Sequence, residues 1–275
     1  TYNDNDLTAI QNKELEVTSI PDSLKEAMQV FLINIAVRSL RGYTNSHNSM
    51  LVHATRFTVV HQKIAVKITE YIDELQEDVI AYGKLSDAQS QSDYIEALST
   101  TFYKYFNQDE FSWNKIIRTL TDQIGSVLIR EVHQKTTVPL EYRKDIATNA
   151  IVIGGTSLAR GYTLEGLNVS YFLRNTVFYD TLMQMGRWFG YRSGYEDLCK
   201  IYMPYDKIVD FAEIITATEE LLEDFQIMAD NNMTPEKFGL AIRQNPNSAL
   251  QITARNKQKN VREFNSPYSF DITYV

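Results

Sequence analysis

The sequence contains a single cysteine, Cys199, among its 275 residues. One cysteine cannot form a disulfide within the chain, which favours a reducing, cytoplasmic compartment. No stretch of about 18 consecutive apolar residues occurs, as a membrane-spanning helix would require. Residues 1–6 also lack the charged and then apolar pattern of a secretion signal. We therefore expect a soluble, cytoplasmic protein with no membrane partner.

The sequence also lacks the residues that would hold a nucleotide and its metal ion. No Gly-x-x-x-x-Gly-Lys-Ser/Thr loop is present, and both Asp-Glu pairs, at residues 73–74 and 109–110, lie in helical or polar segments. Phosphoryl transfer needs a phosphate-binding loop with its lysine and a carboxylate for Mg²⁺. The four histidines have no cysteine or histidine at zinc-ligand spacing. The sequence therefore predicts no metal site and no complete ATP site.

Positive charge is in short supply. The chain has 27 Lys and Arg residues against 35 Asp and Glu residues, a net charge of −8. This balance argues against strong DNA affinity by the chain alone, although a domain that contacts only a few phosphates needs only local positive charge. The densest basic cluster, residues 254–262, is open to two interpretations, a contact with a phosphate backbone or a solvated tail.

The apolar residues follow the pattern of an α/β protein. Hydrophobic residues make up 44% of the chain, as in ordinary globular domains. Short apolar runs near residues 50, 128, 151, 171 and 200 are separated mainly by segments with helical periodicity. This alternation predicts a parallel sheet flanked by helices. Loops at the carboxyl ends of such strands are where ligands bind.

We divide the chain into three parts: an N-terminal extension (1–20), an α/β lobe (21–205) and a C-terminal helical extension (206–275). Ser23 and Glu26 match a capping box at the start of the first helix of the lobe, and residues 14–20 are a candidate edge strand. The acidic, glutamine-rich residues from about 73 to 112 look like a helical insertion. Core packing explains their aromatic side chains better than base stacking does.

The most informative stretch begins at Asn149. Residues 150–153 form an apolar run that stops at two glycines, as a buried strand ending in a sharp turn would. A loop rich in hydroxyl groups and glycine follows, and such loops leave backbone N–H groups free to bind phosphates. The alternative is an ordinary glycine turn after a strand. The candidate binding residues of this loop are Gly154, Gly155, Thr156, Arg160, Gly161 and Thr163.

A second strand at residues 169–173 leads into a helix that we expect to extend to Arg192, with Asn175 or Thr176 as its cap. At about 100° per residue, two sets of side chains fall on opposite faces of this helix. The apolar set is Phe178, Leu182, Met185 and Phe189, and the polar set is Asp180, Gln184, Arg187 and Tyr191. The helix should therefore pack by one face and present Gln184 and Arg187 by the other.

Together these two segments resemble known families. The wording Gly-Gly-x-x-Leu-x-Arg-Gly-x-Thr-Leu-Glu-Gly-Leu, followed by Gln-Met-Gly-Arg-Trp-Phe-Gly-Tyr-Arg, is similar to the bacterial "Z-one" domain family. The pair also resembles motifs V and VI of superfamily-two helicases, which lie in the second RecA-like motor lobe. Members of the Z-one family sit behind a helicase motor in restriction-like and defence gene clusters, and are often labelled endonucleases. The resemblance is strongest over residues 149–203.

The resemblance implies the second RecA-like lobe of an ATP-dependent DNA helicase or translocase. Its first lobe, absent from this chain, would bind most of the ATP and Mg²⁺, and restriction-system subunits would be further partners. Arg187 or Arg192 would act as an arginine finger, and Gln184 would orient a phosphate or water. Both arginines stay candidates for the finger, because the spacing of Gln184, Gly186, Arg187 and Arg192 departs from the family's Gln-x-x-Gly-Arg-x-Gly-Arg.

The resemblance also assigns roles to the loops. Gly154, Gly155, Thr156 and Arg160 would couple the nucleotide state to a nucleic-acid phosphate, with Thr163 or Glu165 near the ribose or the other lobe. His53 and Arg56 follow the strand that corresponds to motif IV and would face the cleft between lobes. The bland alternatives are a strand-end histidine with one hydrogen bond, a surface arginine, and a finger candidate that is only ion-paired to Asp180 or Glu196.

Two functions from other classes stay open beside the motor lobe. One is a catalytically inert interaction module that docks a partner subunit. The other is a metal-dependent endonuclease, for which the sequence offers no convincing set of ligands. We interpret Trp188, Phe189 and Cys199 as packing residues.

Overall fold

The computed structural model describes residues 14–55, 57–132, 140–143, 145–155, 163–173, 179–186, 188 and 193–232, and the backbone of 241–244, 262–265 and 271–274. The chain divides into two compact units. The first contains Thr1–Arg174 and Trp188–Tyr202, and the second contains Asn175–Arg187 and Met203–Val275.

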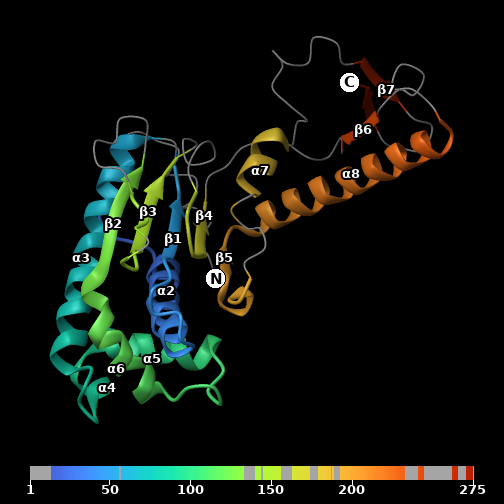
Figure 1. Ribbon diagram of the computed structural model, residues 1–275. Coiled ribbons are helices and arrows are strands. Elements are labelled where there is room, and N and C mark those ends of the chain that lie inside the picture. The colour runs from blue at the N-terminus through green and yellow to red at the C-terminus, as the bar shows by residue number, and fades with distance from the viewer. Residues whose placement is uncertain are drawn as a thin grey trace. The chain divides into compact units, whose positions relative to one another are not determined.

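The first unit is built on a five-stranded sheet (Figure 1). The strands are β1 (Asn48–His53), β2 (Val127–Val132), β3 (Asn149–Gly154), β4 (Leu167–Phe172) and β5 (Lys200–Tyr202). Their order is β2-β3-β1-β4-β5, and every neighbouring pair is parallel. Every residue of the three central strands is buried, as expected for a parallel sheet covered on both faces. The predicted α/β fold is confirmed.

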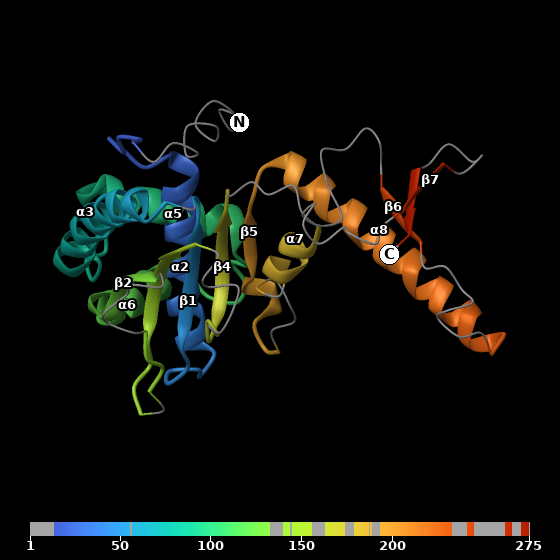
Figure 2. The same cartoon turned by 90° about the horizontal axis from the view of Figure 1, so that it is seen from above.

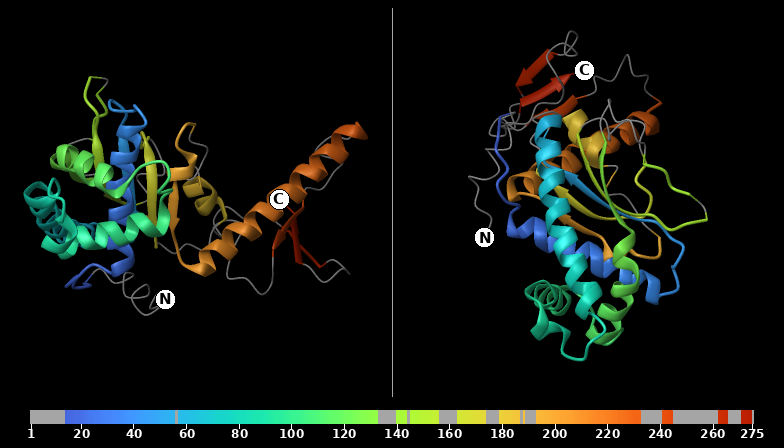
Figure 3. Two further views of the ribbon diagram at one scale, coloured as in Figure 1. Left: turned by 90° about the horizontal axis from the view of Figure 1, so that it is seen from below. Right: turned by 90° about the vertical axis from the view of Figure 1, so that its left-hand side faces the viewer.

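The helices of the first unit are α2 (Asp22–Leu40), α3 (Thr58–Tyr82), α4 (Ala88–Gln91), α5 (Asp93–Tyr105) and α6 (Trp113–Gln123). Figure 3 shows α3 alongside the strands, and Figure 1 shows α4 to α6 near the end where the strands begin. Alternate residues of the strands, such as Met50, Val52 and Ile151, share one hydrophobic core with these helices. Because α2 lies inside this core, every one of its residues from 27 to 38 is buried.

The segment predicted as a helical insertion is helical and contributes to the core. Phe102 of α5 is 1% exposed, and its ring lies 5.7 Å from that of Trp113 and 6.0 Å from that of Phe106, between centroids. Tyr103, one residue along the same helix, is half exposed. The packing of Phe102 supports the interpretation of these aromatic residues as core.

The start of α2 differs from the predicted capping box. The helix begins at Asp22 with Pro21 as its N-cap, and no side chain caps it. Ser23 instead places its Oγ 2.8 Å from the hydroxyl of Tyr171 on β4, and Glu26 accepts a hydrogen bond from the Tyr105 hydroxyl. Both side chains thus have distant partners that replace the local cap. The candidate edge strand at 14–20 was also wrong, because these residues form no strand.

A buried polar network lies at the amino-terminal edge of the sheet. The side chains of Asn48 and Asn149, paired in register on β1 and β3, are joined by a 2.7 Å hydrogen bond. Arg38 of α2 donates to Asn48 Oδ1 and to the His47 carbonyl, both at 2.6 Å, and lies over the ring of Tyr195. Burial lowers the pKa of Arg38 from its usual value. The network fixes the register of the central strands.

The second unit contains α7 (Tyr179–Gly186), α8 (Tyr205–Asp230) and three short strands. Figure 2 shows α7 beside the first half of α8. The strands β6 (Ala241–Gln244), β7 (Arg262–Asn265) and β8 (Asp271–Tyr274) form an antiparallel sheet in the order β6-β8-β7. The C-terminal extension is therefore not purely helical. No helix in the described part of the chain is long and apolar enough to cross a membrane.

Candidate functional site

The strand order marks one position at the carboxyl edge of the sheet. From β1 the chain goes on to β2 on one side, and from neighbouring β4 it goes on to β5 on the other side. Ligands of open parallel sheets bind outside the carboxyl ends of two neighbouring strands whose connections leave to opposite sides. The candidate site of the first unit is therefore formed by the ends of β1, β4 and the adjacent β3.

His53 is the last residue of β1 and ties it to β3. Its side chain is fully buried, and its Nδ1 lies 2.7 Å from the carbonyl oxygen of Gly154. Since a carbonyl can only accept, Nδ1 carries the hydrogen. The imidazole stacks on Phe172 of β4 at 5.3 Å and meets the edge of Trp188 at 5.2 Å, between ring centroids. His53 therefore links three neighbouring parts of the carboxyl edge.

Gly155 opens the loop after β3 and lies against His61 in the first turn of α3. A Cβ at this glycine would lie 3.4 Å from His61 Cε1 and 3.8 Å from the Thr55 carbonyl oxygen. His61 Nε2 is 2.8 Å from that same carbonyl, to which it must donate. The start of the loop therefore lies next to α3, at a distance where an added Cβ would make ordinary van der Waals contact. His61 was not singled out from the sequence, since only the fold brings it to Gly155.

Replacing His53 with phenylalanine should lower the free energy of unfolding by about 1–3 kcal/mol. The aromatic packing on Phe172 is kept, while the Gly154 carbonyl loses its donor in a buried setting. Denaturant unfolding of the purified protein measures the change. A loss below about 0.5 kcal/mol would mean that the hydrogen bond to Gly154 contributes nothing net.

The structure describes the predicted motif helix only as α7; its expected cap at 175 or 176 and residues 187 and 189–192 lie outside the described residues. α7 ends at Gly186, and its apolar face is confirmed by the burial of Leu182 and Met185. Asp180 and Gln184 are partly exposed, as expected for the polar face. Gly186 lies close to Phe211 of α8, where an added Cβ would be 3.6 Å from the ring. Within the second unit, the helix thus packs by its apolar face and keeps Gln184 at its surface.

The structure brings three predicted site residues together: His53, Gly154 and Gly155. Thr163 is exposed and precedes β4, and Gln184 belongs to the second unit. The remaining predicted residues, Arg56, Thr156, Arg160, Gly161, Arg187 and Arg192, lie outside the described residues.

The packing interpretation holds for one residue and fails for another. Trp188 is 5% exposed and contacts His53, so it is a packing residue as predicted. Cys199 was predicted wrongly, because it is exposed and its Sγ lies 3.5 Å from the Tyr195 carbonyl oxygen. It follows a short 3₁₀ turn at the edge strand β5, where only one side is covered.

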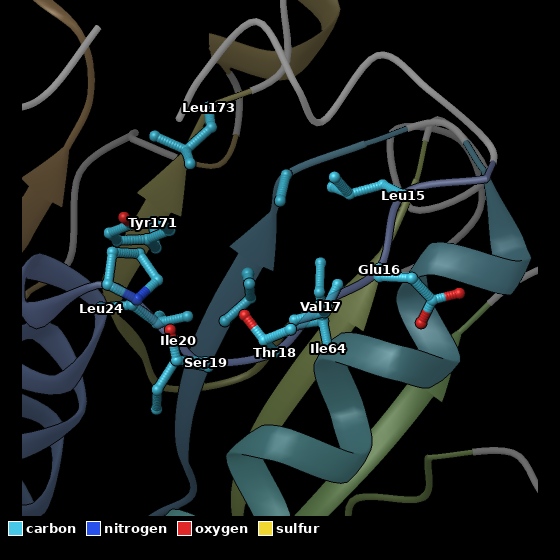
Figure 4. A pocket seen from close by; sticks show the side chains of 13 residues that line it. Leu15, Glu16, Val17, Thr18, Ser19, Ile20, Leu24, Ile64, Tyr171 and Leu173 are labelled. Atoms are coloured by element: carbon cyan, nitrogen blue, oxygen red, sulfur yellow. The ribbon is translucent and has the colours of Figure 1, made fainter. Parts of the chain in front are cut away.

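A cavity of about 220 Å³ lies beside the carboxyl halves of β1 and β4 (Figure 4). The segment 15–20 runs over it, held by Lys63, whose Nζ donates to the Leu15 carbonyl and pairs with Glu16. The lining is mostly apolar and includes Val52, Ile64, Tyr171 and Leu173. None of the predicted site residues that the structure describes lines this cavity.

The described residues contain no group of three or more His, Cys, Asp or Glu side chains placed to hold a metal ion. At the carboxyl edge, the chemistry on offer is that of backbone amides, buried imidazoles and aromatic rings. Such groups can position a phosphate-binding loop, and Gly154 and Gly155 lead directly into residues 156–162.

Comparison with known proteins adds one finding. The sequence model of the Z1 domain matches residues 23–250, which is most of the chain and includes β1 to β5, α7 and α8. Searches of curated proteins and of solved structures gave no match. The resemblance noted from the sequence is thus confirmed at the level of the Z-one, or Z1, family. The chain belongs to the Z1 domain family.

Proposed function

We propose that this chain is the second RecA-like lobe of an ATP-dependent DNA helicase or translocase in a restriction-like or defence system. The observation that carries the proposal is that His53, Gly154 and Gly155 lie together at the carboxyl edge, where the connections from β1 and β4 leave to opposite sides. These are the strand ends at which a motor lobe would receive a phosphate. Membership in the Z1 family supports the same function.

In this function the chain completes a nucleotide site that another lobe mainly builds. Arg187 is the first candidate for the arginine finger and Arg192 the second, because the helical periodicity of the sequence predicts Arg187 on the same face as Gln184. The loop that begins at Gly155 contacts a nucleic-acid phosphate, and His53 holds its base to β1. His61 of α3 packs against Gly155 at the base of the same loop.

ATP with Mg²⁺ would supply the hydrolysable phosphoryl group. The described residues fit only the rim of such a site, since they offer no cluster of carboxylates for the metal. An amide at Gln184 and the guanidinium groups at 187 and 192 are what this chain would present to it. The residues of this chain would then orient and stabilise the transferred phosphoryl group, and another lobe would bind most of the ATP and Mg²⁺.

The test is the ATPase of the intact protein with and without double-stranded DNA. DNA should stimulate turnover, and Gln184→Ala should reduce the stimulated rate by about tenfold or more because the amide orients a phosphate or water. Gln226→Ala is the matched control, since Gln226 is an exposed glutamine of α8 whose Nε2 donates to Asp230.

Two results would contradict the proposal. One is an ATP turnover rate of the intact protein that is the same with and without double-stranded DNA. The other is equal turnover in the Gln184 and Gln226 variants at matched stability.

A further inference from the structure

α8 carries most of the net charge of the chain. It contains eight carboxylates and one lysine, so its net charge is −7 out of −8 for all 275 residues. The lysine, Lys207, is buried and ion-paired with Asp210. The exposed surface of α8 is therefore almost wholly acidic where it is charged, and the rest of the chain is close to neutral.

An apolar stripe runs along the same helix. Ile208, Ile215 and Leu222 are spaced seven residues apart, and their side chains are 50%, 57% and 60% exposed. Residues seven apart drift by only about 20° per step, so the three lie in one line about 21 Å long. We call these three residues the α8 stripe. Large aliphatic side chains exposed in a row mark an interaction surface rather than a solvated face.

The stripe has two different borders. On one side lies the packed face of α8, with Ile214 and Ala217 buried in the second unit. On the other side lie Glu219 and Glu223, within about 100° of the stripe on the helix wheel. A partner seated on the stripe would therefore meet apolar side chains in the middle and carboxylates along one edge.

We propose that the α8 stripe docks an amphipathic helix with an aliphatic seam and lysine or arginine residues along its flank. Aliphatic residues at heptad spacing pack against a matching seam. Basic flanking residues would pair with Glu219 and Glu223, which sets the orientation of the partner and speeds its association. The stripe and the acidic edge together specify this partner, and neither does so alone.

The same charges argue against other occupants. A second copy of α8 would bring two acidic edges together, and like charges disfavour such pairing. A nucleic-acid backbone and an anionic membrane surface are both negative and would be repelled. The second unit would thus be a protein-docking element, and this inference does not depend on the ATPase.

The probe is a 21-residue synthetic helix with leucine at the a and d positions and lysine at e and g, labelled with a fluorophore. Binding to the full chain is followed by anisotropy, and three exposed aliphatic residues should give a Kd on the order of 10 µM at low salt. The double variant Ile215→Gln and Leu222→Gln should weaken binding tenfold or more. The matched control is Val66→Gln with Ile80→Gln on α3, whose side chains are 55% and 54% exposed and also in register.

Charge is tested separately. A peptide with glutamate at e and g should bind at least tenfold more weakly, and Glu219→Gln with Glu223→Gln should flatten the salt dependence of the lysine peptide. Equal binding of both peptides, or unchanged binding to the stripe variant, would overturn the proposal. So would a dimer of the unliganded chain in sedimentation equilibrium that the stripe variant abolishes, because the occupant would then be a second copy.

Discussion

Arg187→Ala should lower the DNA-stimulated ATPase of the intact protein by about 10²-fold or more. An arginine finger contributes roughly 10³ to 10⁵ in rate, equivalent to about 4–7 kcal/mol of the activation barrier. Arg192→Ala, measured beside it, decides which arginine fills the role, because a spacing that departs from the family pattern leaves both as candidates. Replacing the residue that serves as the finger should slow ATP hydrolysis and leave the affinity for DNA unchanged.

The matched control for this experiment is Arg143→Ala. Arg143 is an exposed arginine paired with Asp145 at 2.5 Å, and it lies far from the carboxyl edge in the loop before β3. Its loss should leave turnover within about twofold, because an exposed ion pair contributes little. If both finger candidates turned over like this control, the motor assignment would be wrong and an interaction module would be the better reading.

Gly166→Ala should cost about 3 kcal/mol or more of the free energy of unfolding. Gly166 has φ +65°, and a Cβ there would lie 1.7 Å from the carbonyl oxygen of His47. Neither atom can yield cheaply, because the Gly166 carbonyl accepts from the Ser49 amide where β1 and β4 begin to pair. The added methyl group must therefore separate two backbone segments at the start of the central strands.

Gly42→Ala separates the steric clash from the backbone conformation. Gly42 has φ +93°, yet a Cβ there would meet nothing within 4 Å. Its replacement should cost only the penalty of a left-handed alanine, about 1–2 kcal/mol. Guanidinium unfolding of both variants measures the difference. Equal losses of unfolding free energy would show that the backbone segments at His47 and Gly166 move apart easily, which would contradict the close contact between them.

The strands could be predicted from the sequence because each carries a short, mostly apolar segment between stretches of helical periodicity. Residues 150–153 are apolar throughout and 169–172 are apolar or aromatic except for Ser170, and all of them are buried. The order of the strands could not be predicted in this way, since no local feature places β2 at the edge beyond β3. β6 to β8 were missed because each has four residues in a polar segment.

The candidate site shows the same division. Parallel strands end at one edge of the sheet, which is where His53 Nδ1 and the Gly154 carbonyl oxygen lie 2.7 Å apart. The contact of His61 with Gly155 could not be predicted, because it depends on how α3 crosses the sheet. Ser23 was assigned to a local cap when its partner was Tyr171, far along the chain. Sequence patterns miss such distant partners.

The strand order has a consequence for synthesis on the ribosome. β1 and β2 are made first, but they are not neighbours, because β3 inserts between them. Until residues 149–154 emerge, β1 has no neighbouring strand, and α2 and α3 lack most of the strands that share their core. At roughly 5–20 residues per second, the nearly 100 residues between β1 and β3 take about 5–20 s to make. The nascent chain should be a chaperone client during that interval, and should lose this dependence only after β4, the other neighbour of β1, has also been released.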